Sequence, residues 1–213
     1  MGKQRIFGVI TGKSGTGKSE LIKRYIIPKL LTKKPVFIFD VLNEYEGDEM
    51  FLNFDAFFEY LEEKKEIENK KYVIKWRSDV TVINALKFFR FIEQPVALVF
   101  EEAHELFSKG LYTKLKKPLN QITKYGRHFE IDVIFCTQRP KDLSTNIRSQ
   151  AQFFTSFLQT EEADLDYLEK YNRNFSKNVG LLKKFNYISE GNIPTLLKNL
   201  KENKKMQLWV NHK

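Results

Sequence analysis

The stretch Gly12-Lys13-Ser14-Gly15-Thr16-Gly17-Lys18-Ser19 decides the fold of this chain. It has the spacing G-x-x-x-x-G-K-S of the phosphate-binding P-loop, and it directly follows the apolar run at residues 6–10. Its glycines let the backbone turn tightly so that successive amide groups converge on phosphate oxygens, and the helix that follows adds the positive end of its dipole. We therefore expect all eight residues to bind a nucleotide, with Lys18 on the β- and γ-phosphates and the Ser19 hydroxyl on Mg²⁺.

The length and composition of the chain predict a single globular domain. Its 213 residues suffice for one continuous core, expected at about 5–158, followed by an extension of helix and strand at about 159–213. No apolar run approaches the roughly 20 residues that span a bilayer, and no signal peptide is visible, so we expect a cytoplasmic protein without a transmembrane segment. The net charge of +9 favours a polyanionic partner. The one cysteine, Cys136, lies in an apolar run that is typical of a buried structural thiol.

Apolar runs alternate with amphipathic segments along most of the chain. We predict buried strands at residues 5–11, 35–40, 72–76, 95–100, 132–137 and 152–158. We predict helices at 18–31, 53–65, 80–92 and 161–171, with a further helix at 194–201 and a strand at 207–210. Pro28 falls within the first helix and should kink or shorten it. The alternation predicts an α/β fold with a mostly parallel central sheet and helices on both faces.

Two further strand ends carry polar groups that hydrolysis requires beside a P-loop. Glu101 and Glu102 follow the strand at 95–100, where the first is placed to bind Mg²⁺ or one of its waters and the second to polarise the attacking water. Gln138 follows a neighbouring strand and would contact the γ-phosphate or the water. The cation that hydrolysis needs at the γ-phosphate has three candidates: Arg127, Arg139 and Arg148. A guanidinium that reaches a neighbouring subunit's nucleotide would tie hydrolysis to assembly.

Together these motifs resemble those of the HerA/FtsK superfamily of DNA-pumping ATPases. The matching residues are 12–19, Asp40 with Glu44 and Tyr45, 99–104, 126–128 and 137–140. They span most of the chain, roughly residues 5–157. The resemblance implies a RecA-like P-loop fold of the ASCE class that binds ATP and Mg²⁺ and hydrolyses ATP.

The resemblance also implies roles for single residues. Lys18 and Ser19 bind phosphate and metal in such proteins. Glu101 matches the metal-binding acid of the family and Glu102 its catalytic glutamate. Gln138 matches the sensing glutamine, and Arg127 matches the trans-acting arginine finger. The family usually has aspartate where this chain has Glu101.

A core of this size without additional domains resembles the genome-packaging ATPases of icosahedral viruses with internal membranes. This likeness implies a homo-oligomeric ring, often a hexamer, that pumps double-stranded DNA into a capsid and meets proteins of the capsid vertex. Such a motor would work in the host cytoplasm or in association with the virion. Residues 108–129 contain no acid, and we expect their lysines to grip DNA phosphates, first among them Lys114, Lys116 and Lys117. A solvated helix face would account for the same segment.

Other functions remain open at this stage. One is a motor of the same superfamily that serves conjugation, plasmid transfer or filamentous-phage assembly. Another is a P-loop kinase acting on a nucleoside or a polynucleotide end, although the paired acids and Gln138 favour water as the acceptor. A nucleotide-gated DNA-binding module without catalysis is a third.

Overall fold

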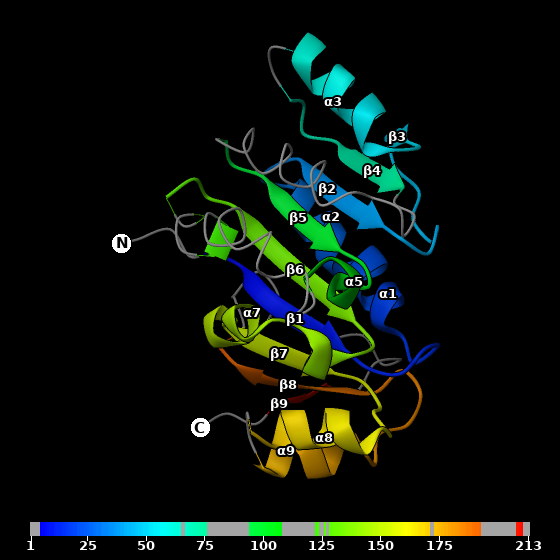
Figure 1. Cartoon of the computed structure of the whole chain (residues 1–213), viewed down its shortest axis with the longest axis vertical. Coiled ribbons are helices and arrows are strands. Elements are labelled where there is room, and N and C mark those ends of the chain that lie inside the picture. Colours follow the sequence, from blue (N-terminus) through cyan, green and yellow to red (C-terminus); the bar gives the residue numbers. More distant parts are fainter. Residues whose placement is uncertain are drawn as a thin grey trace.

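The computed structural model describes residues 5–64, 67–75, 94–107, 122–123, 126, 128–170, 173–192 and 208–210. Within these residues the strands form a nine-stranded sheet in the order β3-β4-β2-β5-β6-β1-β7-β8-β9 (Figure 1). The strands are β1 Phe7–Thr11, β2 Val36–Asp40, β3 Glu49–Phe51, β4 Lys71–Lys75, β5 Ala97–Phe100, β6 Asp132–Thr137, β7 Phe153–Ser156, β8 Tyr187–Gly191 and β9 Leu208–Val210. The helices are α1 Lys18–Leu21, η1 Ile22–Ile26, α2 Ile27–Leu31, α3 Phe54–Glu63, α5 Ala103–Phe107, η3 Pro140–Asp142, α7 Thr145–Gln150, α8 Glu162–Glu169 and α9 Arg173–Val179.

The register of the sheet brings several strand ends to one edge. Every described strand pair is parallel except β7 with β8, which is antiparallel. The last residue of β1, Thr11, is level with Thr137 of β6 and Ser156 of β7. One strand further along, Phe100 of β5 is level with Phe135 of β6. The carboxyl ends of these strands therefore meet where the P-loop begins, at the edge where open α/β sheets bind ligands.

The sheet separates a core rich in aromatic side chains from a mainly aliphatic one, because successive side chains of a strand point to opposite faces. On one face Phe100 stacks between Phe39 and Phe135, with ring centroids 4.6 and 5.6 Å apart. The residue before each of these rings belongs to the second core, which packs against α1, η1 and α2. Since both faces of these strands are buried, the residues within each strand form a continuous apolar run rather than an alternating pattern, and polar residues stand only at the strand ends.

The predicted fold class is confirmed, and the first helix shows how the sequence shapes it. The helix predicted at 18–31 is present, but it contains the π-helical turn η1 directly before α2, in which Pro28 stands in the first turn. Proline has no amide hydrogen to donate to the preceding turn, and its ring crowds the carbonyl there. The wider π turn accommodates this conflict, so the expected kink takes this form.

Several short elements were not predicted, among them β3, α7 and β8. β3 has three residues, which is too short for a hydrophobic period to show, and β8 carries polar residues within it. The helices predicted at 80–92 and 194–201 lie outside the described residues. In the part of the chain that the structure describes, no helix combines the length and apolar character that crossing a membrane requires.

Candidate active site

The P-loop connects the end of β1 to the first turn of α1. Gly12 and Gly17 have φ angles of 146° and 116°, in the left-handed range that favours glycine. A Cβ atom added to Gly12 would lie only 2.6 Å from the Cβ of Phe157, so this turn has no room for a side chain. The buried Lys18 ammonium donates to the carbonyl of Lys13 at 3.2 Å. The amine therefore lies inside the loop, where the lysine of a P-loop binds phosphate.

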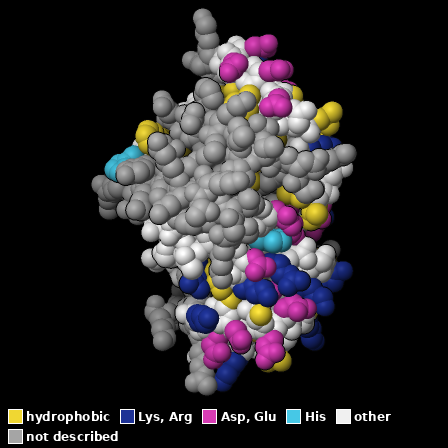
Figure 2. Space-filling view, in the orientation of Figure 1, with side chains coloured by type: hydrophobic (Ala, Val, Ile, Leu, Met, Phe, Trp, Pro, Cys, Tyr) yellow, Lys and Arg dark blue, Asp and Glu magenta, His cyan; other side chains and the backbone are white. Residues whose placement is uncertain are grey.

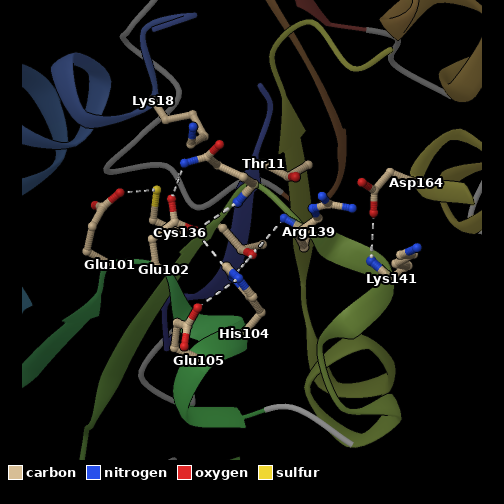
Figure 3. A network of polar contacts seen from close by, with 12 residues as sticks. Thr11, Lys18, Glu101, Glu102, His104, Glu105, Cys136, Arg139, Lys141 and Asp164 are labelled. Atoms are coloured by element: carbon tan, nitrogen blue, oxygen red, sulfur yellow. Dashed lines mark hydrogen bonds and ion pairs between the residues drawn. The ribbon is translucent and has the colours of Figure 1, made fainter. Parts of the chain in front are cut away.

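A cavity of about 190 Å³ opens beside the P-loop. Its P-loop lining consists of Ser14, Gly15, Gly17, Lys18 and Ser19, whereas the other predicted residues of the motif, Gly12, Lys13 and Thr16, do not line it. The ends of two neighbouring strands contribute the polar groups predicted from the sequence: Glu101, Glu102 and Gln138. Figure 3 shows Lys18 and the two glutamates lying together at the carboxyl ends of the strands. The structure thus brings these predicted residues into one site.

Glu101 is a buried carboxyl group with two neutral donors. Its side chain is 1% exposed, and Tyr45 Oη donates to Oε2 at 2.7 Å while Cys136 Sγ donates to Oε1 at 3.2 Å. Burial raises the pKa of Glu101 to about 7, although the hydrogen bonds from Tyr45 and Cys136 oppose this rise. A cation at this carboxyl group would favour its charged form.

Glu102 lies beside Glu101 but has a different environment. Its φ angle is 45°, which turns the chain from β5 into α5, and its Oε1 accepts from Gln138 Nε2 at 2.5 Å. Its Oε2 accepts from the Gln138 amide at 3.2 Å and lies 3.2 Å from His104 Nδ1. Burial alone would raise the pKa of Glu102, but the hydrogen bonds from His104 and Gln138 outweigh it and lower the pKa. Glu102 is thus the carboxylate of the pair that stays charged at neutral pH.

Several residues of the site had no predicted role. His104 Nδ1 lies 3.0 Å from Thr137 Oγ1 and so joins α5 to the end of β6. Gln159 Nε2 donates to Thr11 Oγ1 at 2.9 Å and to the Gln138 carbonyl at 3.1 Å. The sequence offered one signal for Gln159: it directly follows the strand predicted at residues 152–158. The strands beside β1 end at the sheet edge that carries the P-loop, so a residue in this position lies near the site. Cys136 is buried as predicted, but it also donates to the metal-site candidate Glu101.

The side chains around this cavity fit a nucleoside triphosphate with Mg²⁺. In such sites Mg²⁺ takes one or two protein oxygens and completes its shell with phosphates and water. Ser19 and Glu101 line the cavity and supply oxygens of that kind, and Lys18 supplies a cation for the phosphates. No group of three His, Cys, Asp or Glu side chains within the described residues could hold a metal by itself. The oxygens of Ser19 and Glu101 fit a metal that binds together with phosphate.

Comparison with known families assigns the chain. The sequence model of the Zonular occludens toxin (Zot) family matches residues 7–161, which is well over half of the chain and includes both the P-loop and Gln138. The chain belongs to the Zot family. The match runs from β1 to just beyond β7, so the Zot region contains all the strands whose carboxyl ends form the site.

Relatives of this Zot-family chain support the predicted resemblance. The DNA double-strand break repair helicase HerA of Sulfolobus acidocaldarius is 34% identical over 96 residues, which is 45% of this chain and 19% of HerA. The matched region thus spans about a fifth of that curated relative. The genome packaging NTPase B204 of Sulfolobus turreted icosahedral virus 2, solved with ATP-gammaS, superposes with a TM-score of 0.67 at 22% identity over 88% of this chain and 92% of B204. VirB4 of Thermoanaerobacter pseudethanolicus gives 0.62 at 12% identity over 84% of each chain. The prediction of a HerA/FtsK-type P-loop ATPase is confirmed.

The basic residues predicted for the Zot-family site are only partly placed. Arg127, Lys114, Lys116 and Lys117 lie outside the described residues. Arg139 is exposed directly after Gln138, at the edge that carries the P-loop. Arg148 lies on α7, which leads into the amino end of β7 and so stands at the opposite edge (Figure 1). Figure 2 shows Lys and Arg side chains gathered near the ends of β6 and β7, with acidic side chains among them.

Replacing Tyr45 with phenylalanine should destabilise the protein, and more strongly at higher pH. The change removes a donor to a buried carboxyl oxygen of Glu101, a loss worth about 1–3 kcal/mol. Because the folded pKa of Glu101 is about 7, above its ordinary value, stability falls as pH rises toward and through 7. Without Tyr45 Oη that pKa rises further, so urea unfolding without nucleotide or metal should show a larger loss at about pH 8.5 than at about pH 6.

Tyr187→Phe is the matched control, because Tyr187 Oη is buried without a hydrogen-bond partner among the described residues. Its loss should change stability little and equally at both pH values. An equal effect of Tyr45→Phe at both pH values would mean that the Tyr45 hydroxyl does not act on the charged form of Glu101.

Proposed function

We propose that this chain is an ATPase that moves double-stranded DNA and, more narrowly, a viral genome-packaging motor that fills a capsid. ATP hydrolysis is supported by the convergence of Glu102, Gln138 and Lys18 on one cavity. A kinase could use a carboxylate to activate an acceptor hydroxyl, but the amide of Gln138 beside Glu102 suits the positioning of water. The similarity to HerA supports movement of DNA, and the fold shared with the genome packaging NTPase B204 supports the narrower statement.

The reaction follows from the roles of the chain's own residues. The P-loop amides and Lys18 would hold the β- and γ-phosphates, and Ser19 and Glu101 would hold Mg²⁺, which would supply positive charge for the phosphate oxygens. Glu102 accepts a proton from the attacking water as the water oxygen bonds to the γ-phosphorus. The bond from that phosphorus to the bridging oxygen breaks, and ADP and phosphate leave.

The Glu102–Gln138 pair links this reaction to phosphate sensing. Both carboxylate oxygens of Glu102 accept hydrogen bonds from Gln138, and these bonds stabilise its charge and so lower its basicity toward water. The Gln138 side-chain amide gains an alternative acceptor when a γ-phosphate enters the cavity. Transfer of this amide to the phosphate would remove one of the bonds and raise the basicity of Glu102 when ATP is in place.

Glu102→Gln should abolish ATP hydrolysis while leaving ATP affinity within about twofold, because glutamine keeps the shape but cannot accept the proton. Phosphate release and calorimetric binding of ATP measure the two effects. Glu105→Gln is the matched control, since Glu105 is half exposed on α5, the helix that follows Glu102, and contacts the other ring nitrogen of His104. Hydrolysis that survives Glu102→Gln would remove Glu102 from this role.

The DNA partner is proposed from the basic segment at residues 108–129 and from the relatives. Changing Lys114, Lys116 and Lys117 together to alanine should weaken duplex binding and lower the slope of log affinity against log salt by about three. The matched control removes the same charge from three exposed lysines elsewhere: Lys33, Lys64 and Lys177. DNA binding and ATPase stimulation that are equal in both triple variants would exclude the first set as DNA contacts.

We also propose that the active form is a homo-oligomeric ring in which Arg127 completes the neighbouring subunit's site. If the protein is a packaging motor, we expect this ring to be a hexamer. Mixtures of Arg127→Ala and Lys18→Ala subunits should then regain ATPase activity, because some interfaces combine an intact P-loop with an intact arginine. Parallel mixtures with Arg139→Ala and Arg148→Ala test the other two arginines. Failure of Arg127→Ala mixtures to regain activity at any ratio would contradict this assignment.

A further inference from the structure

The turn before β8 is attached to the P-loop. The amide of Phe185 donates to the carbonyl of Thr16 at 2.8 Å. A Cβ atom added to Gly17 would lie 2.7 Å from Cδ1 of Phe185, so the phenyl ring also packs on the loop. Phe185 has a φ angle of 65°, and the turn around it is closed by the bond from the Asn186 amide to the Lys183 carbonyl at 3.0 Å. An aromatic side chain is therefore held at the edge of the phosphate site.

The order of the strands places Phe185 on the side opposite the hydrolytic groups. Glu102 and Gln138 follow β5 and β6, which lie on one side of β1, whereas β7 and β8 lie on the other. Because β8 is antiparallel to β7, its amino end stands beside the carboxyl end of β7. The residues that precede β8 consequently reach the same cavity from the far side, and Lys184 and Phe185 line it.

This arrangement fixes the direction of a bound nucleotide. The γ-phosphate must lie near Glu102 and Gln138 for the proposed hydrolysis, with the phosphate chain running along the P-loop. The ribose and base then extend away from β5 and β6, toward the side where Phe185 lies. The ring of Phe185 is accessible there, because the residue is 40% exposed. The group that faces the ring is the exposed side chain of Lys184, whose Nζ lies 5.1 Å from the ring centroid.

We propose that Phe185 is the base-binding residue of this site and stacks on the nucleobase of the bound nucleoside triphosphate. The proposal rests on the proposed function, which sets the direction of the phosphates. An entering base displaces the flexible Lys184 side chain from the ring and gains a flat apolar surface. Stacking of a base on an aromatic side chain is strong enough to change affinity about tenfold or more.

Two ligands, one with a base and one without, distinguish stacking of Phe185 on the base from its support of the P-loop. Calorimetry with ATP and with inorganic tripolyphosphate, both with Mg²⁺, compares the wild-type protein with Phe185→Leu and Phe185→Tyr. Leucine keeps apolar bulk against Gly17 but cannot stack, so ATP affinity should fall about tenfold while tripolyphosphate affinity stays unchanged. Tyrosine should keep wild-type affinity for both ligands. Phe129→Leu, a change at a similarly exposed phenylalanine that does not line the cavity, should affect neither ligand.

Each alternative gives a different result. Equal losses of ATP and tripolyphosphate affinity in Phe185→Leu would mean that Phe185 only supports the P-loop, which overturns the proposal. Should that variant fail to fold, Phe185→Trp serves instead: ATP should quench its added fluorescence and tripolyphosphate should not, and quenching by neither or by both overturns the proposal. Failure of the proposed function looks different, because Lys18→Ala would then bind both ligands as the wild type does, or the wild type would bind neither.

Discussion

The parallel pairing of β5, β6, β1 and β7 is the constraint on which the site depends. Parallel register brings the carboxyl ends of these strands level, so residues more than 100 positions apart in the sequence meet at one edge. Each strand end needs to supply only one or two side chains: the P-loop follows β1, the glutamates follow β5 and Gln138 follows β6. Burial of both sheet faces fixes this register, because a slip of one residue would exchange the aromatic and aliphatic cores.

The two adjacent glutamates show how the fold separates the properties of identical side chains. Both are almost fully buried, at 1% and 5% exposure, yet their pKa values move in opposite directions. Among the described residues Glu101 receives two neutral donors, which do not offset its loss of water. Glu102 accepts hydrogen bonds from the side chain and from the backbone amide of Gln138, and it also contacts His104. These contacts favour its charged form. Neighbouring carboxyl groups with pKa values pushed apart are typical of sites that assign them different tasks.

The central strands and the polar residues that follow them could be predicted, because both depend on local patterns in the sequence. Uninterrupted apolar runs identify strands buried on both faces, and an acid or amide directly after such a run must lie at the ligand edge. Tyr45 could not be given its role in this way, because its hydroxyl reaches Glu101 only after the loop beyond β2 folds back and its amide bonds to Asp40 at 2.8 Å. Phe185 was missed for a related reason: β8 carries no apolar run, and its direction depends on tertiary packing.

The reversed direction of β8 also has a mechanical consequence. A strand that ran parallel to β7 would begin at the far edge of the sheet, and its start could not touch the P-loop. Because β8 begins at the near edge, the Phe185 amide and the Thr16 carbonyl join the start of that strand to the phosphate loop. A shift of the turn before β8 is therefore coupled directly to the P-loop backbone, through this peptide hydrogen bond and through the Phe185 ring that packs on Gly17.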